Sequence, residues 1–219
     1  MRYSFVFSAI ALFLAVPAVA APPAVPDTPF IQEYRDFFTL DGRAGDVRAL
    51  AVDGKNRVWA ATAAGIYALK DGKTFTAMQT EEEAGPSFSA AAAPDGRVWI
   101  GAWNGLYHTT DKGTLEKVPA IQEPIGAVAA SRSCIAAQGP QGLWLNRHGI
   151  WTKHTGTWAN SAAALAFESD EIFWSATAHG VYRFNHAVPV RHLYSGDELL
   201  ASEETAVAVA GDGTIWCGG

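Results

Sequence analysis

Residues 95–107 read DGRVWIGAWNGLY, and variants of this stretch return along the whole chain. A turn comes first, an apolar strand around Trp99 follows, and a second turn leads into another short strand. Further copies lie at residues 56–67, 171–182 and 212–219, and a degenerate copy at 134–144 has Ala136 in place of the tryptophan. Because such internal similarity determines the architecture, it is considered before any single residue.

The tryptophan position recurs at residues 59, 99, 136, 174 and 216, which are separated by intervals of 40, 37, 38 and 42 residues. Apolar residues alternate at period two in these segments, and glycine interrupts them every few residues, so the pattern excludes helical repeats. A period of about 40 residues with several short strands in each unit is typical of propeller blades. We therefore predict an all-β fold, a β-propeller of four-stranded antiparallel blades.

Runs of small apolar residues precede each tryptophan position, at 49–52, 90–93, 127–130, 162–166 and 206–210. Alanine is a poor strand former, so its repetition at one position indicates a crowded place rather than a local preference. We expect these runs to form the innermost strands, where the sheets converge. The tryptophans are then expected to fill the wider gaps between blades, where each buries about 150–250 Å².

The N-terminal region precedes the repeats. Residues 1–20 are expected to be a secretory signal peptide, with Arg2 at its start, an apolar core and the small-residue motif of residues 18–20 at its end. Residues 21–29 form a Pro-rich linker. Residues 30–40 are predicted to be a strand that completes the last blade, so that no sheet edge stays open.

The propeller is expected to span residues 30–219, with blades at about 46–80, 85–119, 124–155, 160–194 and 205–219. The fifth blade breaks off, so about four and a half blades form an incomplete ring. We interpret the chain as a fragment of a longer protein, because a closed ring needs more repeats of about 40 residues. Cys134 and Cys217 lie a whole blade apart and are expected to be unpaired.

Charge excludes one class of partner. The chain has 16 basic and 22 acidic residues, a net charge of −6, and loss of Arg2 with the signal leaves 15 against 22, or −7. Nucleic acid requires a basic surface, so no nucleic-acid partner is expected. The signal peptide predicts a periplasmic or secreted location, with membrane attachment only through a missing C-terminal part.

The sequence shows no recognisable catalytic set. Its six histidines lie in no metal-binding motif, and it contains neither a nucleophile elbow nor a P-loop, so we expect no catalytic residues, no metal and no cofactor. The acidic residues at 81–83 and at 197, 198, 203 and 204 are interpreted as solvated loops. The alternative for these carboxylates is a site for calcium or a cationic ligand.

One face of the propeller carries the candidate ligand site, because the turns after the tryptophan strands and the loops into the inner strands share that face. The residues expected there are Trp103, Asn104, Gln141, Trp158 and His179, together with Arg48 at the start of the first inner strand. An exposed indole beside amides can stack a sugar or another flat ligand, and Arg48 can meet an anion. The alternative is ordinary packing of loops and blades.

At these repeats the chain resembles the two-component regulator propeller family. The resemblance is closest at residues 95–107, includes the lead-in at 34–46, and extends over residues 30–219. It implies a non-enzymatic, periplasmic, ligand-sensing part of a bacterial signalling protein. It also implies that a missing part carries further blades, a sandwich-like domain, a membrane helix and a kinase or cyclase module.

Two other functions remain open. Streptogramin-lyase-like propellers share the Asp-Gly-x-x-Trp pattern, although their Asn-x-Ile-Gly-Arg-Ile continuation is absent here. A propeller that serves only as a protein-interaction module is the other alternative. The expected partner is therefore an unknown small molecule or oligosaccharide, or a protein.

Overall fold

The computed structural model describes residues 38–156, 162–196, 199 and 203–219. The expected signal peptide and linker, and Trp158, lie outside these residues. Most of the strand predicted at 30–40 also lies outside them. Residues 38–40, its described end, are not in a strand, so that part of the prediction is wrong. The chain there turns instead into a short 3-10 helix, η1 (Gly42–Gly45), before the first sheet begins.

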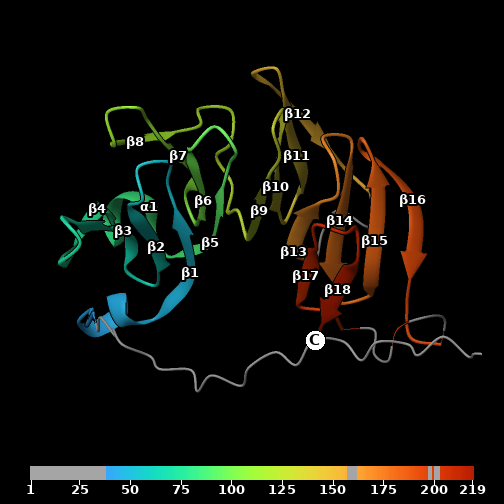
Figure 1. Ribbon diagram of the computed structural model, residues 1–219, viewed down its shortest axis with the longest axis horizontal. Coiled ribbons are helices and arrows are strands. Elements are labelled where there is room, and N and C mark those ends of the chain that lie inside the picture. Colours follow the sequence, from blue (N-terminus) through green and yellow to red (C-terminus); the bar gives the residue numbers. More distant parts are fainter. Residues whose placement is uncertain (1–37, 157–161, 197–198, 200–202) are drawn as a thin grey trace, which may run out of the picture. The chain divides into compact units, whose positions relative to one another are not determined.

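Four sheets of four antiparallel strands and one sheet of two strands make up the described part of the chain (Figure 1). The first sheet contains β1 (Val47–Val52), β2 (Val58–Thr62), β3 (Gly65–Lys70) and β4 (Thr74–Thr80). The second contains β5 (Ser87–Ala92), β6 (Val98–Ala102), β7 (Gly105–Thr109) and β8 (Leu115–Lys117). The third contains β9 (Ala127–Ala130), β10 (Cys134–Gly139), β11 (Gly142–Arg147) and β12 (Ile150–His154).

The fourth sheet contains β13 (Ala162–Phe167), β14 (Ile172–Thr177), β15 (Gly180–Asn185) and β16 (Val188–Leu193), and the fifth contains β17 (Ala206–Val209) and β18 (Ile215–Gly218). Neighbouring strands in every sheet are consecutive in the chain. The one α-helix among the described residues is the four-residue α1 (Glu81–Ala84) between the first two sheets. The predicted fold class, an incomplete all-β propeller, is confirmed.

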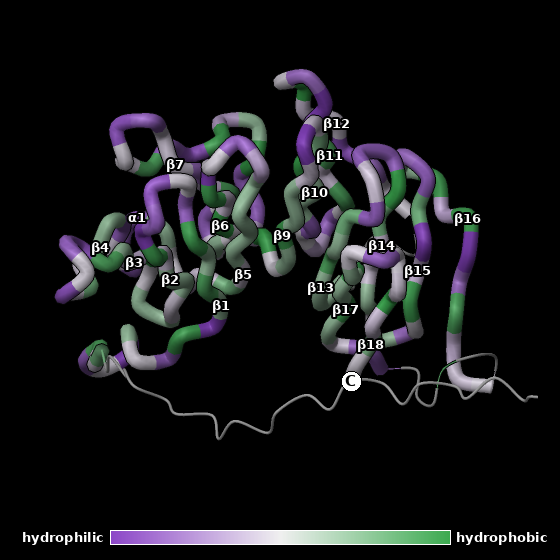
Figure 2. The backbone as a smooth tube through the Cα atoms, viewed as in Figure 1, coloured by the Kyte–Doolittle hydropathy of each residue, from purple (hydrophilic) through white to green (hydrophobic). Residues whose placement is uncertain are grey.

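Successive sheets meet through their first strands: β1 contacts β5, β5 contacts β9, β9 contacts β13, and β13 contacts β17. These first strands carry the alanine-rich runs, which confirms their inner position. Small side chains are needed there because the sheets approach one another most closely along these strands. Figure 2 shows hydrophobic colour along the strands and hydrophilic colour at many of the turns that join them.

The tryptophans fill the gaps between sheets. Trp59 has no exposed surface and packs in a cluster with Val98, Ile100 and Tyr107 of the second sheet. Trp99 packs in the same way against the third sheet. The third sheet has Ala136 at this position, and the gap after it is filled from the other side by Phe173 and Phe184 of the fourth sheet. These aromatic side chains therefore provide much of the contact between sheets.

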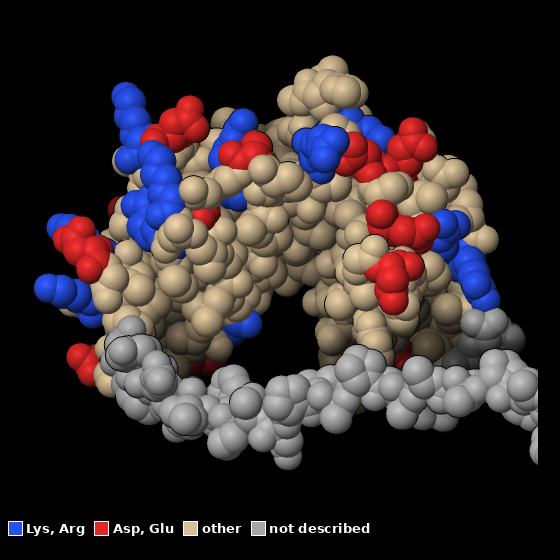
Figure 3. Space-filling view, in the orientation of Figure 1, with Lys and Arg blue, Asp and Glu red and all other residues tan. Residues whose placement is uncertain are grey.

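The surface carries both signs of charge. Figure 3 shows lysine and arginine side chains close to aspartate and glutamate on the face in view. Ion pairs among the described residues include Arg43 with Glu81 at 3.0 Å and Arg97 with Asp95 at 3.0 Å. Both cysteines are free, with Cys134 buried and Cys217 exposed. No helix within the described ranges is long and apolar enough to cross a membrane.

Candidate functional site

Three of the first strands contain an extra residue that has no partner on the next strand. The pairing of β1 with β2 passes over Arg48, that of β5 with β6 passes over Phe88, and that of β13 with β14 passes over Ala163. Each of the three lies eleven residues before its tryptophan (59 − 48, 99 − 88 and 174 − 163). A bulge redirects the side chain of the extra residue away from the regular alternation of the strand. Arg48 and Phe88 therefore occupy the same place in successive sheets.

Trp103 and Asn104 form the two-residue turn between β6 and β7, and this turn is tied to the segment before β5. The Trp103 amide donates to the Pro86 carbonyl oxygen at 2.8 Å, and the Asn104 amide donates to that of Ala84 at 3.0 Å. Asn104 Nδ2 also donates to the carbonyl oxygen of Glu83, at 2.9 Å. Asn104 thus holds the turn in place, while 57% of the Trp103 side chain stays exposed.

The segment beneath Trp103 is itself well ordered. Helix α1 begins with a capping box in which the Thr80 amide donates to Glu83 Oε2 at 2.9 Å. Gly85 follows with φ +70°, and a Cβ atom there would lie 2.6 Å from Trp103 Cβ, so only glycine suits this position. Burial, together with the Glu83 charge, raises the pKa of Tyr107, whose hydroxyl donates to the Glu83 carbonyl oxygen at 3.3 Å.

Arg48, Phe88 and Trp103 make a continuous row, which we call the aromatic row. Arg48 Cζ lies 5.3 Å from the centre of the Phe88 ring. The Phe88 ring centre is 6.5 Å from that of Trp103, with the planes inclined at 58°. Arg48 Nη2 also pairs with Asp46 Oδ2 at 3.0 Å. The row thus presents an aromatic surface with a cationic group at one end.

A cavity of about 440 Å³ adjoins the aromatic row. Its lining comes from the second, third and fourth sheets: Phe88, Trp103, Pro124, Gly126, Gln138, Gly139, Pro140 and Ala162. The lining is mostly apolar, and the Gln138 amide is its main polar side chain. Gln138 Nε2 donates to the carbonyl oxygens of Gly139 at 2.7 Å and Gly142 at 3.1 Å, which fixes its orientation. An apolar hollow with an exposed aromatic wall suits a ring-shaped ligand.

Of the described residues expected at this site, Trp103 alone lines the cavity. Asn104 is its neighbour in the turn, Arg48 is connected to it through Phe88, and the remaining two have other partners. Gln141 is in the turn between β10 and β11. Its side-chain Oε1 accepts a hydrogen bond from Lys153 Nζ at 3.2 Å, and its backbone amide donates to Glu123 Oε2 at 3.2 Å. His179 is in the equivalent turn between β14 and β15, and its carbonyl oxygen is hydrogen-bonded to His192 Nε2 at 2.7 Å. Of the residues predicted for this face, the structure brings together Trp103, Asn104 and Arg48.

Phe88 was missed in the sequence, although it connects Arg48 to Trp103. The repeat indicates this residue, because Phe88 stands at the position of Arg48 when Trp59 and Trp99 are aligned. Gln138 and Pro140 were missed as well. They belong to the degenerate copy, whose missing tryptophan obscured its register.

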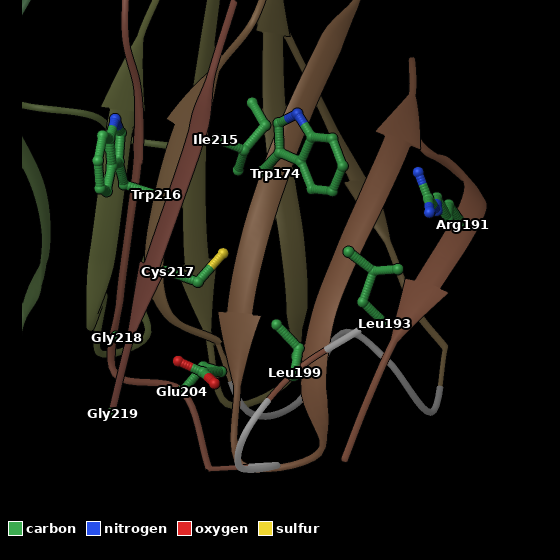
Figure 4. Close-up of a pocket in the computed structure, with 10 residues that line it drawn as sticks. All are labelled: Trp174, Arg191, Leu193, Leu199, Glu204, Ile215, Trp216, Cys217, Gly218 and Gly219. Carbon is green, nitrogen blue, oxygen red and sulfur yellow. The ribbon is translucent and has the colours of Figure 1, made fainter. Parts of the chain in front are cut away.

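A second cavity, of about 600 Å³, lies between the fourth and fifth sheets (Figure 4). In Figure 4, Trp174, Ile215 and Cys217 lie around the same space, while the Trp216 indole is on the other side of β18. Glu204 also lines this cavity and is only 6% exposed, so its interpretation as part of a solvated acidic loop is wrong. Burial and the Glu204 charge both raise the pKa of Cys217.

Of the other acidic residues interpreted as solvated loops, Asp197 and Glu198 lie outside the described residues. Glu83 completes the capping box, and Glu81 pairs with Arg43 at 3.0 Å. Within the part of the chain that the structure describes, no three residues of the types His, Cys, Asp and Glu are grouped so that they could hold a metal ion.

No family model and no curated protein matches this chain. Solved structures do match. The extracellular domain of the putative one component system BT4673 from B. thetaiotaomicron has a TM-score of 0.65 and 19% identity, and the match covers 86% of this chain and 27% of that one. Virginiamycin B lyase from Staphylococcus aureus has a TM-score of 0.61 and 15% identity over 78% of this chain and 62% of that one.

An ancestral GH74 enzyme matches with a TM-score of 0.63 and 17% identity, over 80% of this chain and 28% of that one. This chain therefore spans less than two thirds of the length of each of these proteins. At such low identities the likeness establishes the propeller fold that they share, and residues specific to any one of them are not implied.

Proposed function

We propose that this chain is the ligand-sensing propeller portion of an exported bacterial signalling protein and that it acts by binding rather than by catalysis. The observation that carries the proposal is the aromatic row beside the cavity of about 440 Å³. A cavity of this size, lined by apolar groups with a few oriented polar ones, is typical of small-molecule sites. The fold that the chain shares with the extracellular domain of the putative one component system BT4673 is compatible with this function.

The ligand that we favour is an oligosaccharide. One face of a sugar ring presents C–H groups that pack on an indole, and its hydroxyls remain available for hydrogen bonds at the edge. Trp103 supplies the indole, which is 57% exposed and lies in a turn whose backbone is held by hydrogen bonds, so that little conformational freedom is lost on binding. Arg48 at the other end of the row favours a ligand with an acidic group.

The proposed location is outside the cytoplasm, in the periplasm or secreted. The N-terminal sequence supports it, because residues 1–20 have the pattern of a secretory signal. The extracellular origin of the first structural match supports it independently.

Titration with a panel of neutral and acidic disaccharides, followed by calorimetry, tests the proposal. We expect binding by at least one member and a loss of about tenfold or more in Trp103→Ala, because truncation of an aromatic anchor at a binding site costs about 2 kcal/mol or more. Trp216→Ala is the matched control, since this indole is 66% exposed but lies away from the row. Equal binding by both variants would count against the proposed site.

The resemblance to lyase propellers supports no second function here. The identity to virginiamycin B lyase is 15%, at which the match speaks for the fold alone. A protein partner is the remaining outcome of the test. It would be indicated if no saccharide binds while Trp103→Ala releases a protein captured by the native chain.

A further inference from the structure

Several indoles that are buried or partly buried in this protein donate hydrogen bonds to carboxylates. Three indole nitrogens donate to acidic side chains: Trp59 to Asp53 at 3.0 Å, Trp144 to Glu123 at 2.7 Å, and Trp174 to Glu168 at 2.8 Å. In the first and fourth sheets the carboxylate lies six residues before the tryptophan (59 − 53 and 174 − 168). The first and fourth sheets therefore share this carboxylate, whereas the second, third and fifth have Ala93, Ala130 and Ala210 at the same position.

An arginine completes each of these two sets. Arg57 Nε lies 3.1 Å from Asp53 Oδ2, and Arg57 Cζ lies 4.6 Å from the centre of the Trp59 ring. In the fourth sheet Arg183 pairs with Glu168 at 2.9 Å and lies 5.7 Å from the centre of the Trp174 ring. Indole, carboxylate and guanidinium thus form a unit in which the anion is hydrogen-bonded and its charge is neutralised.

The second sheet has the indole and the arginine of this unit without the carboxylate. The residue six positions before Trp99 is Ala93, and the equivalent of Arg57 is Arg97. Trp99 is 7% exposed, and its Nε1 is buried with no hydrogen-bond partner in the described structure. A buried donor without an acceptor is unfavourable, and such groups are few in folded proteins.

A cavity of about 400 Å³ lies at this position, between the β5–β6 turn and the turns of the third sheet. Ala93, Trp99 and Arg97 line it from the second sheet, and Arg132, Asn146 and His148 line it from the third. Two carboxylates near this cavity already have partners. Asp95 forms an ion pair with Arg97 at 3.0 Å, and Asp170 accepts a hydrogen bond from the Ser133 backbone amide at 3.1 Å. Arg132 forms no ion pair within the described ranges.

We propose that this cavity binds a small organic acid, whose carboxylate takes the place of the side chain that the second sheet lacks. One ligand oxygen accepts the hydrogen bond from Trp99 Nε1, and Arg132 balances the charge. Because Nε1 is covered by neighbouring side chains, binding requires a small side-chain movement of the kind common at ligand sites. The site is distinct from the aromatic row, since Trp99 stands near the opposite end of β6, four residues or roughly 13 Å along the strand from Trp103 at about 3.3 Å per residue.

The test uses the indole N–H signals of the full ¹⁵N-labelled chain in NMR spectra, with Trp99→Phe to assign the Trp99 signal. Sodium succinate is added at constant ionic strength, and succinamide, which lacks the charge, is the matched control. We expect a saturable downfield shift of the Trp99 signal with succinate alone. The proposal is overturned if succinate does not shift the Trp99 indole signal, or if succinamide shifts it equally.

Two variants sharpen the test. Ala93→Asp supplies the carboxylate from within the chain, so its Trp99 signal should already be shifted and should no longer respond to succinate. Arg132→Gln should weaken succinate binding about three- to fivefold, as expected for an exposed charge, whereas Lys70→Gln removes a charge elsewhere and should have no effect. If Ala93→Asp does not fold, the succinate affinities of Arg132→Gln and Lys70→Gln are compared instead. Equal succinate affinities in these two variants would refute the proposal.

Discussion

Replacement of Trp59 by alanine is expected to destabilise the protein by about 3–5 kcal/mol, as is usual for a large aromatic in a core. The structure supports the upper half of this range. Trp59 is fully buried against the second sheet, and burial of about 150–250 Å² at about 25 cal/mol per Å² corresponds to at most about 4–6 kcal/mol. The replacement also leaves Asp53 without one of its hydrogen bonds.

Trp59→Phe separates the two contributions. It keeps a ring in the gap but removes the N–H that donates to Asp53 Oδ2 at 3.0 Å. Asp53 retains hydrogen bonds from the amides of Lys55 and Arg57 and from Arg57 Nε. We therefore expect a loss of about 1.5–3 kcal/mol, the usual contribution of a hydrogen bond to a charged acceptor.

The measurement is urea unfolding followed by far-ultraviolet circular dichroism, because tryptophan fluorescence changes with the substitution itself. Trp216→Ala is the control, since this residue holds the same place in the repeat but is 66% exposed. It should change the free energy of unfolding by no more than about 0.5 kcal/mol. The reasoning fails if Trp59→Ala and Trp216→Ala cost the same, because burial between sheets would then not be what Trp59 contributes.

Three further results are expected. Burial alone would raise the pKa of Asp53, but the hydrogen bonds from Trp59, Arg57 and Lys55 outweigh it and hold this pKa below its ordinary value. The resulting stabilisation is present above the unfolded-state pKa of about 3.9 and is lost as pH falls through the lower folded value, so Asp53→Asn should flatten the fall in Tm below pH 4. Gly85→Ala should destabilise the folded protein by about 1–3 kcal/mol and weaken ligand binding at Trp103. The reason is that Gly85 has φ +70° and that a Cβ atom there would lie 2.6 Å from Trp103 Cβ. Calorimetry measures the binding, and Gly211→Ala, which has open space around it, is the control. Iodoacetamide should modify the exposed Cys217 in the native protein and leave Cys134, which is 1% exposed, unmodified. Peptide mass spectrometry distinguishes the two sites. Modification of both cysteines at equal rates would contradict the packing of β10.

The candidate site could be predicted from the sequence only in part. Trp103 was identified because the turns after the tryptophan strands share one face of a propeller, and Arg48 because it stands at the start of the first inner strand. Their connection through Phe88 was not, because it depends on bulges that place Arg48 and Phe88 side by side in adjacent sheets. Gln141 and His179 were predicted from equivalent turns, but equivalent turns in different sheets lie at different distances from one cavity.

The interpretation of the acidic residues shows the same limit. Glu203 and Glu204 are adjacent in a polar connection, and nothing in their order distinguishes them. Glu204 is nevertheless 6% exposed, because its amide donates to the Thr177 carbonyl oxygen at 3.1 Å and draws that residue against the fourth sheet. Burial of this kind arises from contacts between segments far apart in the chain.

The sequence by itself determined the repeat, the all-β fold and the radial order of alanine and tryptophan, because each blade repeats the same local pattern and the same steric requirement. Only the tertiary structure decided which side chains meet between blades. The second sheet illustrates the difference: Ala93 is visible in the sequence as one more alanine, yet the unpaired Trp99 nitrogen and the cavity beside it exist only where two sheets face each other. Spacing along one strand fixes the direction of a side chain, whereas its partners are set by the packing of neighbouring sheets.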